Sequence, residues 1–150
     1  VAHRVDAVMG YSNNEPLQLA ARGFPVRTFS VSDYQPLISN GIITAEDTFH
    51  SQPQMVRAFV QATLKGLKDV IADPSGAITI CKTYIPTLTD TAQALTELKA
   101  TIPLWQGSSQ PGYNDSAAWQ SMEQFLVAQK MIKPVTNLAQ DYTNQAVSKS

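Results

Sequence analysis

The sequence predicts an α/β protein of which these 150 residues form a helix-rich C-terminal portion. Three short apolar runs are typical of strands, and several longer stretches follow the 3.6-residue period of amphipathic helices. Two or three strands are too few to make a stable sheet beneath five or six helices that each need one face covered. Val1 also starts the chain without a methionine and nearly inside a strand. The alternative is a small, mostly helical domain with an irregular hairpin.

The predicted strands all lie in the first third of the chain. Val5–Met9 is an apolar run closed by Gly10, which predicts a buried strand. Phe24–Val31 alternates apolar and polar residues, and Leu37–Ile43 is a third strand-like run. The expected order is therefore strand, helix, strand, linker, strand.

Start and stop signals place the helices. A short helix is expected between the polar turn after Gly10 and Gly23, because Pro16 fits a first helical turn and glycine suits the position after a last turn. From Thr44 onward the pattern is helical. A short helix is expected to open with a Thr44–Asp47 capping box and to end near His50, and a long helix is expected from Pro53 through Ile71. Two more helices are expected, one from Pro74 to Tyr84 and one that is capped by Thr89 and continues through Ile102. The last two are a helix capped by Asn114 or Asp115, with Trp119 on its apolar face, and a weaker helix over Leu138–Val147.

Composition excludes several classes of function. Eleven Lys and Arg against twelve Asp and Glu give a net charge of −1, with no basic stripe, so no nucleic-acid partner is expected. No apolar run is long enough to cross a membrane. The single cysteine, Cys81, excludes an internal disulfide framework, and on an apolar helix face it is expected to be inert. His3 and His50 stand apart from any carboxylate at metal-ligand spacing, so neither a metal nor a cofactor is expected.

The turn after the first predicted strand is the best candidate site. Ligands of open α/β sheets gather at the carboxyl ends of strands and at the helix starts that follow. Here Tyr11 offers a flat face for stacking, Asn13 and Asn14 offer amide donors and acceptors, and Glu15 can accept from a ring N–H. Spacing alone equally allows these residues to do no more than cap the helix and complement its dipole.

A second candidate is the segment Ser30–Gln35 between two predicted strands. Asp33 and Tyr34 within it could face a cleft at a hinge, although such a sequence is more often a plain turn.

Three stretches together resemble the thiamine-pyrimidine-synthase-like (NMT1/THI5-like) substrate-binding proteins of ABC importers. They are VDAVMGYSNNEPLQLAARGFPVRTFSVSDY, then PQMVRAFVQATLKGLKDVIADP, and finally Trp119 with FLVAQKMIKP and DYTNQAV. The resemblance covers nearly the whole chain. It implies a two-lobed periplasmic-binding-protein fold (type II), with residues 1–32 as the end of the second lobe and the crossover strand, and 33–150 as the C-terminal part of the first lobe.

The resemblance also implies a site and a ligand. Gly10, Tyr11, Asn13, Asn14 and Glu15 match the family's Gly-Tyr-x-Asn-Asn-Glu turn, which borders the cleft and contacts an aromatic heterocycle. Asp33 and Tyr34 match the Asp-Tyr of the crossover. Ser12 stands where a Trp is common, which leaves room for a flat ligand other than the thiamine pyrimidine precursor, such as riboflavin.

The expected function is that of a non-catalytic solute-binding component of an ABC importer, taking a vitamin or vitamin precursor. Its partners would be a small heterocyclic ligand and the transporter permease, with the membrane reached only through the permease or an upstream lipid anchor. The location would be periplasmic or otherwise extracytoplasmic. The alternatives are a pyrimidine-synthesising enzyme of the same family, whose cysteine-rich motif is not seen here, and a sulfonate or nitrate binder, which the lack of clustered Arg at the turn disfavours.

Overall fold

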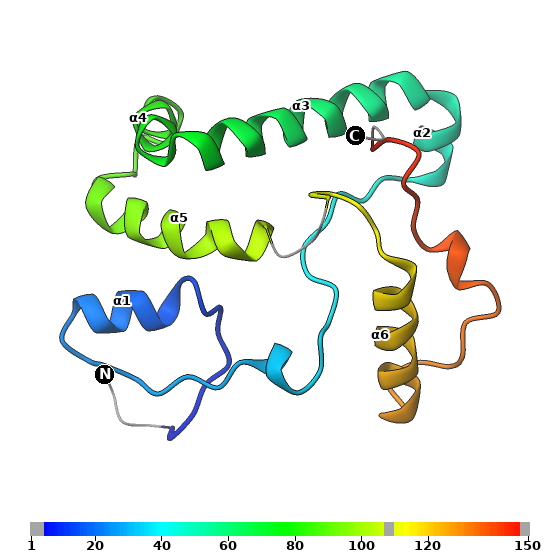
Figure 1. Cartoon of the computed structure of the whole chain (residues 1–150), viewed down its shortest axis with the longest axis horizontal. Coiled ribbons are helices and arrows are strands. Elements are labelled where there is room, and N and C mark those ends of the chain that lie inside the picture. Colours follow the sequence, from blue (N-terminus) through cyan, green and yellow to red (C-terminus); the bar gives the residue numbers. More distant parts are fainter. Residues whose placement is uncertain (1–4, 107–109, 148–150) are drawn as a thin grey trace. The chain divides into compact units, whose positions relative to one another are not determined.

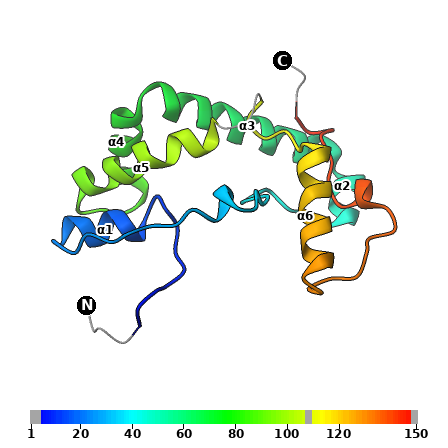
Figure 2. The ribbon, with the colours of Figure 1, turned by 60° about the horizontal axis from the view of Figure 1, so that its bottom comes forward.

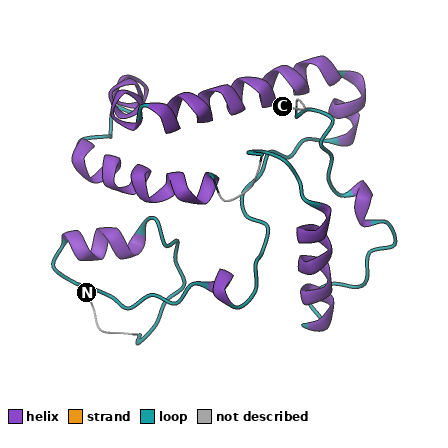
Figure 3. Ribbon diagram, viewed as in Figure 1, coloured by secondary structure: helices purple, strands orange, loops and turns teal. Residues whose placement is uncertain are grey.

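The computed structural model describes residues 5–106 and 110–147, and regular structure in these ranges is entirely helical (Figure 3). The elements are α1 (Glu15–Ala21), the 3₁₀ turn η1 (Val31–Asp33), α2 (Glu46–Ser51), α3 (Pro53–Ala72), α4 (Pro74–Tyr84), α5 (Thr91–Trp105), α6 (Ser116–Ala128) and η2 (Leu138–Gln140). This helical content fits the helix-rich part of the prediction.

The three predicted strands are wrong for the described residues. Val5–Met9, Phe24–Val31 and Leu37–Ile43 contain no strand, apart from the start of η1 at Val31. An alternating or apolar run shows only which faces a segment would bury, whereas a strand also needs a neighbouring segment to complete its hydrogen-bond ladder. No ladder forms within the described ranges, so the helix-rich part of the prediction is what the structure shows there. The hairpin of the alternative is absent from the same ranges.

Local signals placed most of the helices correctly. The long helix begins at Pro53 as predicted, and the Asp73 carboxylate caps α4 by accepting the Gly76 N–H at 2.9 Å. Asp115 caps α6 by accepting the Ala117 N–H at 2.8 Å.

Other cap and helix predictions need correction. Asp90, rather than Thr89, accepts the Gln93 N–H at 2.8 Å at the start of α5. Ala45 occupies the N-cap of α2, so no capping box forms there. The helix expected over Leu138–Val147 shortens to η2, because the segment beyond it is held by side-chain contacts to α6.

The chain divides into two compact units, each described by itself. The first comprises Val1–Ser30 and Val70–Trp105, and within it α5 packs against both α4 and α1 (Figures 1 and 2). Helix α1 ends at Ala21, and Gly23 takes the position after the C-cap that was predicted for it, with a φ of 79° in the left-handed region that favours glycine. The Phe24 N–H then donates to the Leu19 carbonyl at 2.8 Å, which completes the helix end.

The second unit comprises Val31–Asp69 and Gln106–Ser150. Its C-terminal segment forms contacts with other parts of the same unit. The Asn144 Oδ1 accepts the Asn114 backbone N–H at 2.7 Å, and its Nδ2 donates to the Asn114 carbonyl at 3.0 Å. Trp119 of α6 stacks on Tyr142 with ring centroids 4.9 Å apart. Gln61 of α3 donates to the carbonyl of Ala146 at 2.8 Å, so this segment contacts both helices.

Apolar side chains remain accessible throughout the described residues, none of which is buried. Phe59 on α3, for example, is 61% exposed. The apolar helix faces therefore find no cover within the described part of the chain.

Candidate functional site

The turn at residues 10–15 is closed by its own hydrogen bonds. The Asn14 N–H donates to the Tyr11 carbonyl at 2.9 Å, and the Tyr11 N–H donates to Oε2 of Glu15 at 2.6 Å. The same carboxylate lies close to Gly10, where a Cβ would stand 2.8 Å from Oε2. The carboxylate of Glu15 is therefore directed back onto the turn at the start of α1.

Neither asparagine caps helix α1. Asn14 stands at the N-cap position, but its side chain makes no cap hydrogen bond, and its Oδ1 instead accepts from Gln18 Nε2 at 2.6 Å. The Nδ2 of Asn13 donates to Oγ1 of Thr101 on α5 at 2.8 Å. The interpretation in which these amides only cap the helix is therefore wrong, and their use as ligand contacts stays a prediction.

Tyr11 presents its ring to the surroundings. The residue is 64% exposed, while its backbone N–H and carbonyl both form hydrogen bonds within the turn. A ring with a fixed backbone and an open face can stack on a flat ligand without first being uncovered. Ser12 beside it is also exposed, so no bulky side chain at position 12 competes for that space.

Asp33 and Tyr34 lie in the other unit. Asp33 ends η1, and the Tyr34 N–H donates to the Val31 carbonyl at 3.0 Å. Tyr34 as a residue is 79% exposed. The boundary between the two units falls between Ser30 and Val31, within the segment predicted to act as a hinge. The role of these two residues stays a prediction.

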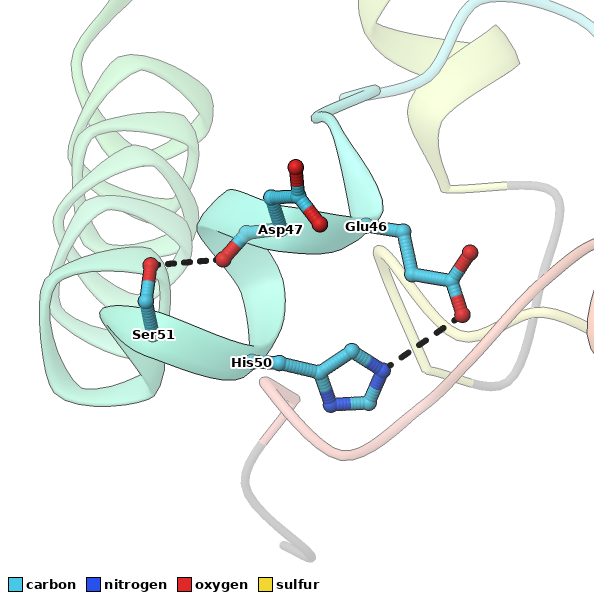
Figure 4. A network of polar contacts seen from close by, with 4 residues as sticks. All are labelled: Glu46, Asp47, His50 and Ser51. Carbon is cyan, nitrogen blue, oxygen red and sulfur yellow. Dashed lines mark hydrogen bonds and ion pairs between the residues drawn. The ribbon is translucent and has the colours of Figure 1, made fainter.

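The two contacts between a basic and an acidic side chain that are found among the described residues each lie within one helix. Nε2 of His50 lies 3.6 Å from Oε1 of Glu46 on α2 (Figure 4), so the expectation that His50 has no carboxylate beside it is wrong. His50 does take the helix-end position predicted for it. On α3, the Asp69 carboxylate accepts from the Lys65 ammonium at 2.8 Å, and this hydrogen bond and its charge raise the pKa of Lys65 above its usual value. Neither pair forms a ligand site.

Neither a hollow nor a metal-ligand cluster adds a second site among the described residues. An open hollow of about 380 Å³ lies between α4 and α5, with Ser75, Lys82 and Thr91 among its lining residues, and it contains none of the predicted site residues. Within residues 5–106 and 110–147, no three His, Cys, Asp or Glu side chains gather as metal ligands. None of the described helices is both long and apolar enough to cross a bilayer.

Sequence reasoning missed one residue of the candidate site. Thr101 reaches Asn13 from a helix 88 residues further along the chain. Nothing in the local pattern around Thr101 marks it, since a threonine on a half-buried helix face is an ordinary occurrence. Only the packing of α5 against α1 brings the two side chains together.

Comparison with known proteins identifies the family. The model of the family described as "NMT1/THI5 like" matches residues 1–77. The riboflavin-binding protein RibY of Chloroflexus aurantiacus is 32% identical, and the alignment covers 96% of this chain and 43% of RibY, so the chain spans less than half the length of that relative. No solved structure matches. The matched family model includes the whole turn at residues 10–15 and both residues of the predicted hinge, and the chain belongs to the NMT1/THI5-like family.

Proposed function

We propose that this chain belongs to a solute-binding protein that captures a flat nitrogen heterocycle, with riboflavin as the first candidate ligand. The protein would deliver its ligand to the permease of an ABC importer from the periplasm or another extracytoplasmic location, with contact to the membrane through that permease or a lipid anchor. It would bind without chemical conversion of the ligand.

The observation that carries this proposal is the arrangement of the turn at residues 10–15. An exposed aromatic ring, two asparagine amides and a carboxylate stand within six residues. The backbone of the turn is closed by the Asn14–Tyr11 and Tyr11–Glu15 hydrogen bonds, so these groups are held before any ligand arrives. An aromatic face for stacking, beside hydrogen-bond donors and acceptors, suits a planar ring with a polar edge.

The choice of riboflavin rests on the relative and on one residue. RibY is named as a riboflavin-binding protein, and its alignment with this chain includes nearly every residue here. Ser12 is small and exposed, which leaves space beside the Tyr11 ring for a three-ring system as well as for a single pyrimidine. A thiamine pyrimidine precursor is the second ligand to test.

Capture would follow the two-lobed mode of periplasmic binding proteins. In this proposal residues 1–32 end the second lobe and include the crossover, and 33–150 belong to the first lobe. Asp33 and Tyr34 would then lie where the lobes flex and close on the ligand. One unit boundary lies in this segment, between Ser30 and Val31, whereas residues 70–105 group with residues 1–30 rather than with the rest of the proposed first lobe.

Two other functions of related proteins are less well supported. An anion binder usually pairs its ligand with a guanidinium group, and the turn at residues 10–15 contains no arginine. A pyrimidine-synthesising enzyme would convert its ligand, and incubation of the full-length protein with candidate pyrimidines and flavins, followed by chromatography, would detect any product.

Titration of the full-length protein tests the proposal. Riboflavin fluorescence should be quenched on binding, since the ring stacks on tyrosine, and native mass spectrometry of protein purified without refolding should show retained ligand. An aminopyrimidine and nitrate serve as comparison ligands. Saturable binding of riboflavin, with no response to nitrate, supports the proposal; binding of nitrate but of neither heterocycle refutes it.

A further inference from the structure

The amide of Asn13 is held in one orientation by a chain of two hydrogen bonds. Its Nδ2 lies 2.8 Å from Oγ1 of Thr101, and the same Oγ1 lies 2.8 Å from the carbonyl oxygen of Glu97, one turn earlier on α5. Asn13, Thr101 and Glu97 are all half-buried. The contact therefore joins the candidate turn to a helix of the same unit.

Counting protons decides the direction of these bonds. A backbone carbonyl only accepts, so the single hydroxyl proton of Thr101 is donated to Glu97. The Oγ1 lone pairs are then left to accept from Asn13, which must turn its NH₂ group toward the helix. The Oδ1 atom of Asn13 then points away from Thr101, and it has no hydrogen-bond partner among the described residues.

In the neighbouring Asn14 the oxygen of the amide, rather than the nitrogen, is already bonded. Its Oδ1 accepts from Gln18 at 2.6 Å, so its NH₂ group is the one without a partner in the described part of the chain. The turn thus offers an acceptor on Asn13 and a donor on Asn14. A ligand edge with an N–H group next to a carbonyl or ring nitrogen would satisfy both.

We infer that Thr101 is a positioning residue, which fixes Asn13 as a hydrogen-bond acceptor and so makes the turn select heterocycles that carry a ring or exocyclic N–H group. This inference rests on the proposed function, because it assigns a specificity to that same site. An imide edge, as in the isoalloxazine ring of riboflavin, and an aminopyrimidine edge both meet this requirement. Nitrate and sulfonates have no donor, and Oδ1 of Asn13 would repel them.

The orientation of Asn13 can be measured without any ligand. In full-length protein labelled with ¹⁵N-asparagine, Asn13→Asp identifies the Asn13 side-chain signals by their loss. Those signals should show slowed exchange and a nuclear Overhauser contact to the Thr101 methyl group. Thr101→Val, which keeps the shape and removes the hydroxyl, should abolish the slowed exchange and shift the signals, whereas Thr101→Ser should keep the slowed exchange.

A matched control comes from the same helix. The hydroxyl of Thr96 donates to the Ala92 carbonyl at 3.0 Å, as that of Thr101 does to Glu97, but Thr96 is exposed and has no further partner among the described residues. Thr96→Val therefore removes an equivalent helix contact and should leave the Asn13 signals unchanged.

Specificity is measured with riboflavin and 3-methylriboflavin, in which a methyl group replaces the imide hydrogen. The wild-type protein should prefer riboflavin by roughly tenfold or more, since the analogue leaves the Asn13 acceptor without a partner. In Thr101→Val that preference should fall at least about fivefold, while Thr101→Ser and Thr96→Val retain it. The bulk of the methyl group is the same in every variant, so a change of preference reports the hydrogen bond.

Different outcomes refute the riboflavin-binding function and the positioning role of Thr101. If wild-type protein binds neither flavin, the proposed riboflavin function is refuted. The positioning role of Thr101 is refuted, even when riboflavin binds, if Thr101→Val leaves the Asn13 signals unchanged. It is also refuted if this variant weakens the binding of both flavins equally, so that the preference for riboflavin is retained.

Discussion

Replacement of Tyr11 by alanine should weaken riboflavin binding strongly and leave the stability of the ligand-free protein nearly unchanged. Tyr11 is 64% exposed, so removal of its ring uncovers little apolar surface, and the free energy of unfolding should change by less than about 0.5 kcal/mol. Loss of one stacked aromatic ring costs about 1–3 kcal/mol of binding. At about 1.4 kcal/mol per tenfold, the dissociation constant should rise roughly 5- to 150-fold.

The backbone contacts of the turn should survive this substitution. The Tyr11 N–H and carbonyl bond to Glu15 and Asn14, and alanine supplies both groups. Tyr11→Phe, which keeps the ring, should bind riboflavin nearly as tightly as the wild type. The loss in Tyr11→Ala can therefore be assigned to stacking.

Isothermal titration calorimetry with riboflavin, together with thermal unfolding without ligand, measures both effects on the full-length protein. Tyr84→Ala is the matched control, because Tyr84 is 80% exposed at the end of α4 in the same unit, outside the turn. An unchanged affinity in Tyr11→Ala would refute the assignment of this turn as the site. So would an equal loss in Tyr84→Ala.

Three further predictions concern stability and self-association. Asn144→Ala should lower the free energy of unfolding of the full-length protein by about 1–2 kcal/mol in urea titrations, because the Asn114 backbone N–H and carbonyl lose their partner; an equal effect of Asn137→Ala, whose side chain makes no cap hydrogen bond, would contradict this. Asp73→Ala should cost about 1 kcal/mol in the same assay through loss of the α4 cap, and Asp73→Asn should restore most of it. The 150-residue chain expressed alone should be molten or self-associated in analytical ultracentrifugation and near-UV circular dichroism, since none of its described residues is buried; a monomer with a cooperative melting transition would show that reasoning to be mistaken.

The sequence by itself determined the helices whose signals are local. In α3 the 3.6-residue period and Pro53 mark the helix and its start, and in α4 and α6 the caps Asp73 and Asp115 bond to residues two or three positions away. A helix satisfies its backbone within four residues, so a short window of sequence contains nearly all the relevant interactions. The turn before α1 could be predicted for the same reason, because the hydrogen bonds that close it join residues three or four positions apart.

Only the tertiary structure decided what depends on distant partners. Whether Val5–Met9 forms a strand depends on a neighbouring segment that local periodicity cannot report, and no such pairing occurs in the described ranges. The segment at 141–147 follows the pattern of a helix, yet Asn144 bonds across 30 positions to Asn114. Thr101 meets Asn13 across 88 positions, and the orientation of that amide is set by a hydroxyl whose proton is already given to its own helix. Sequence spacing shows which polar groups are present, but contacts between helices decide which atoms of those groups remain available to a ligand.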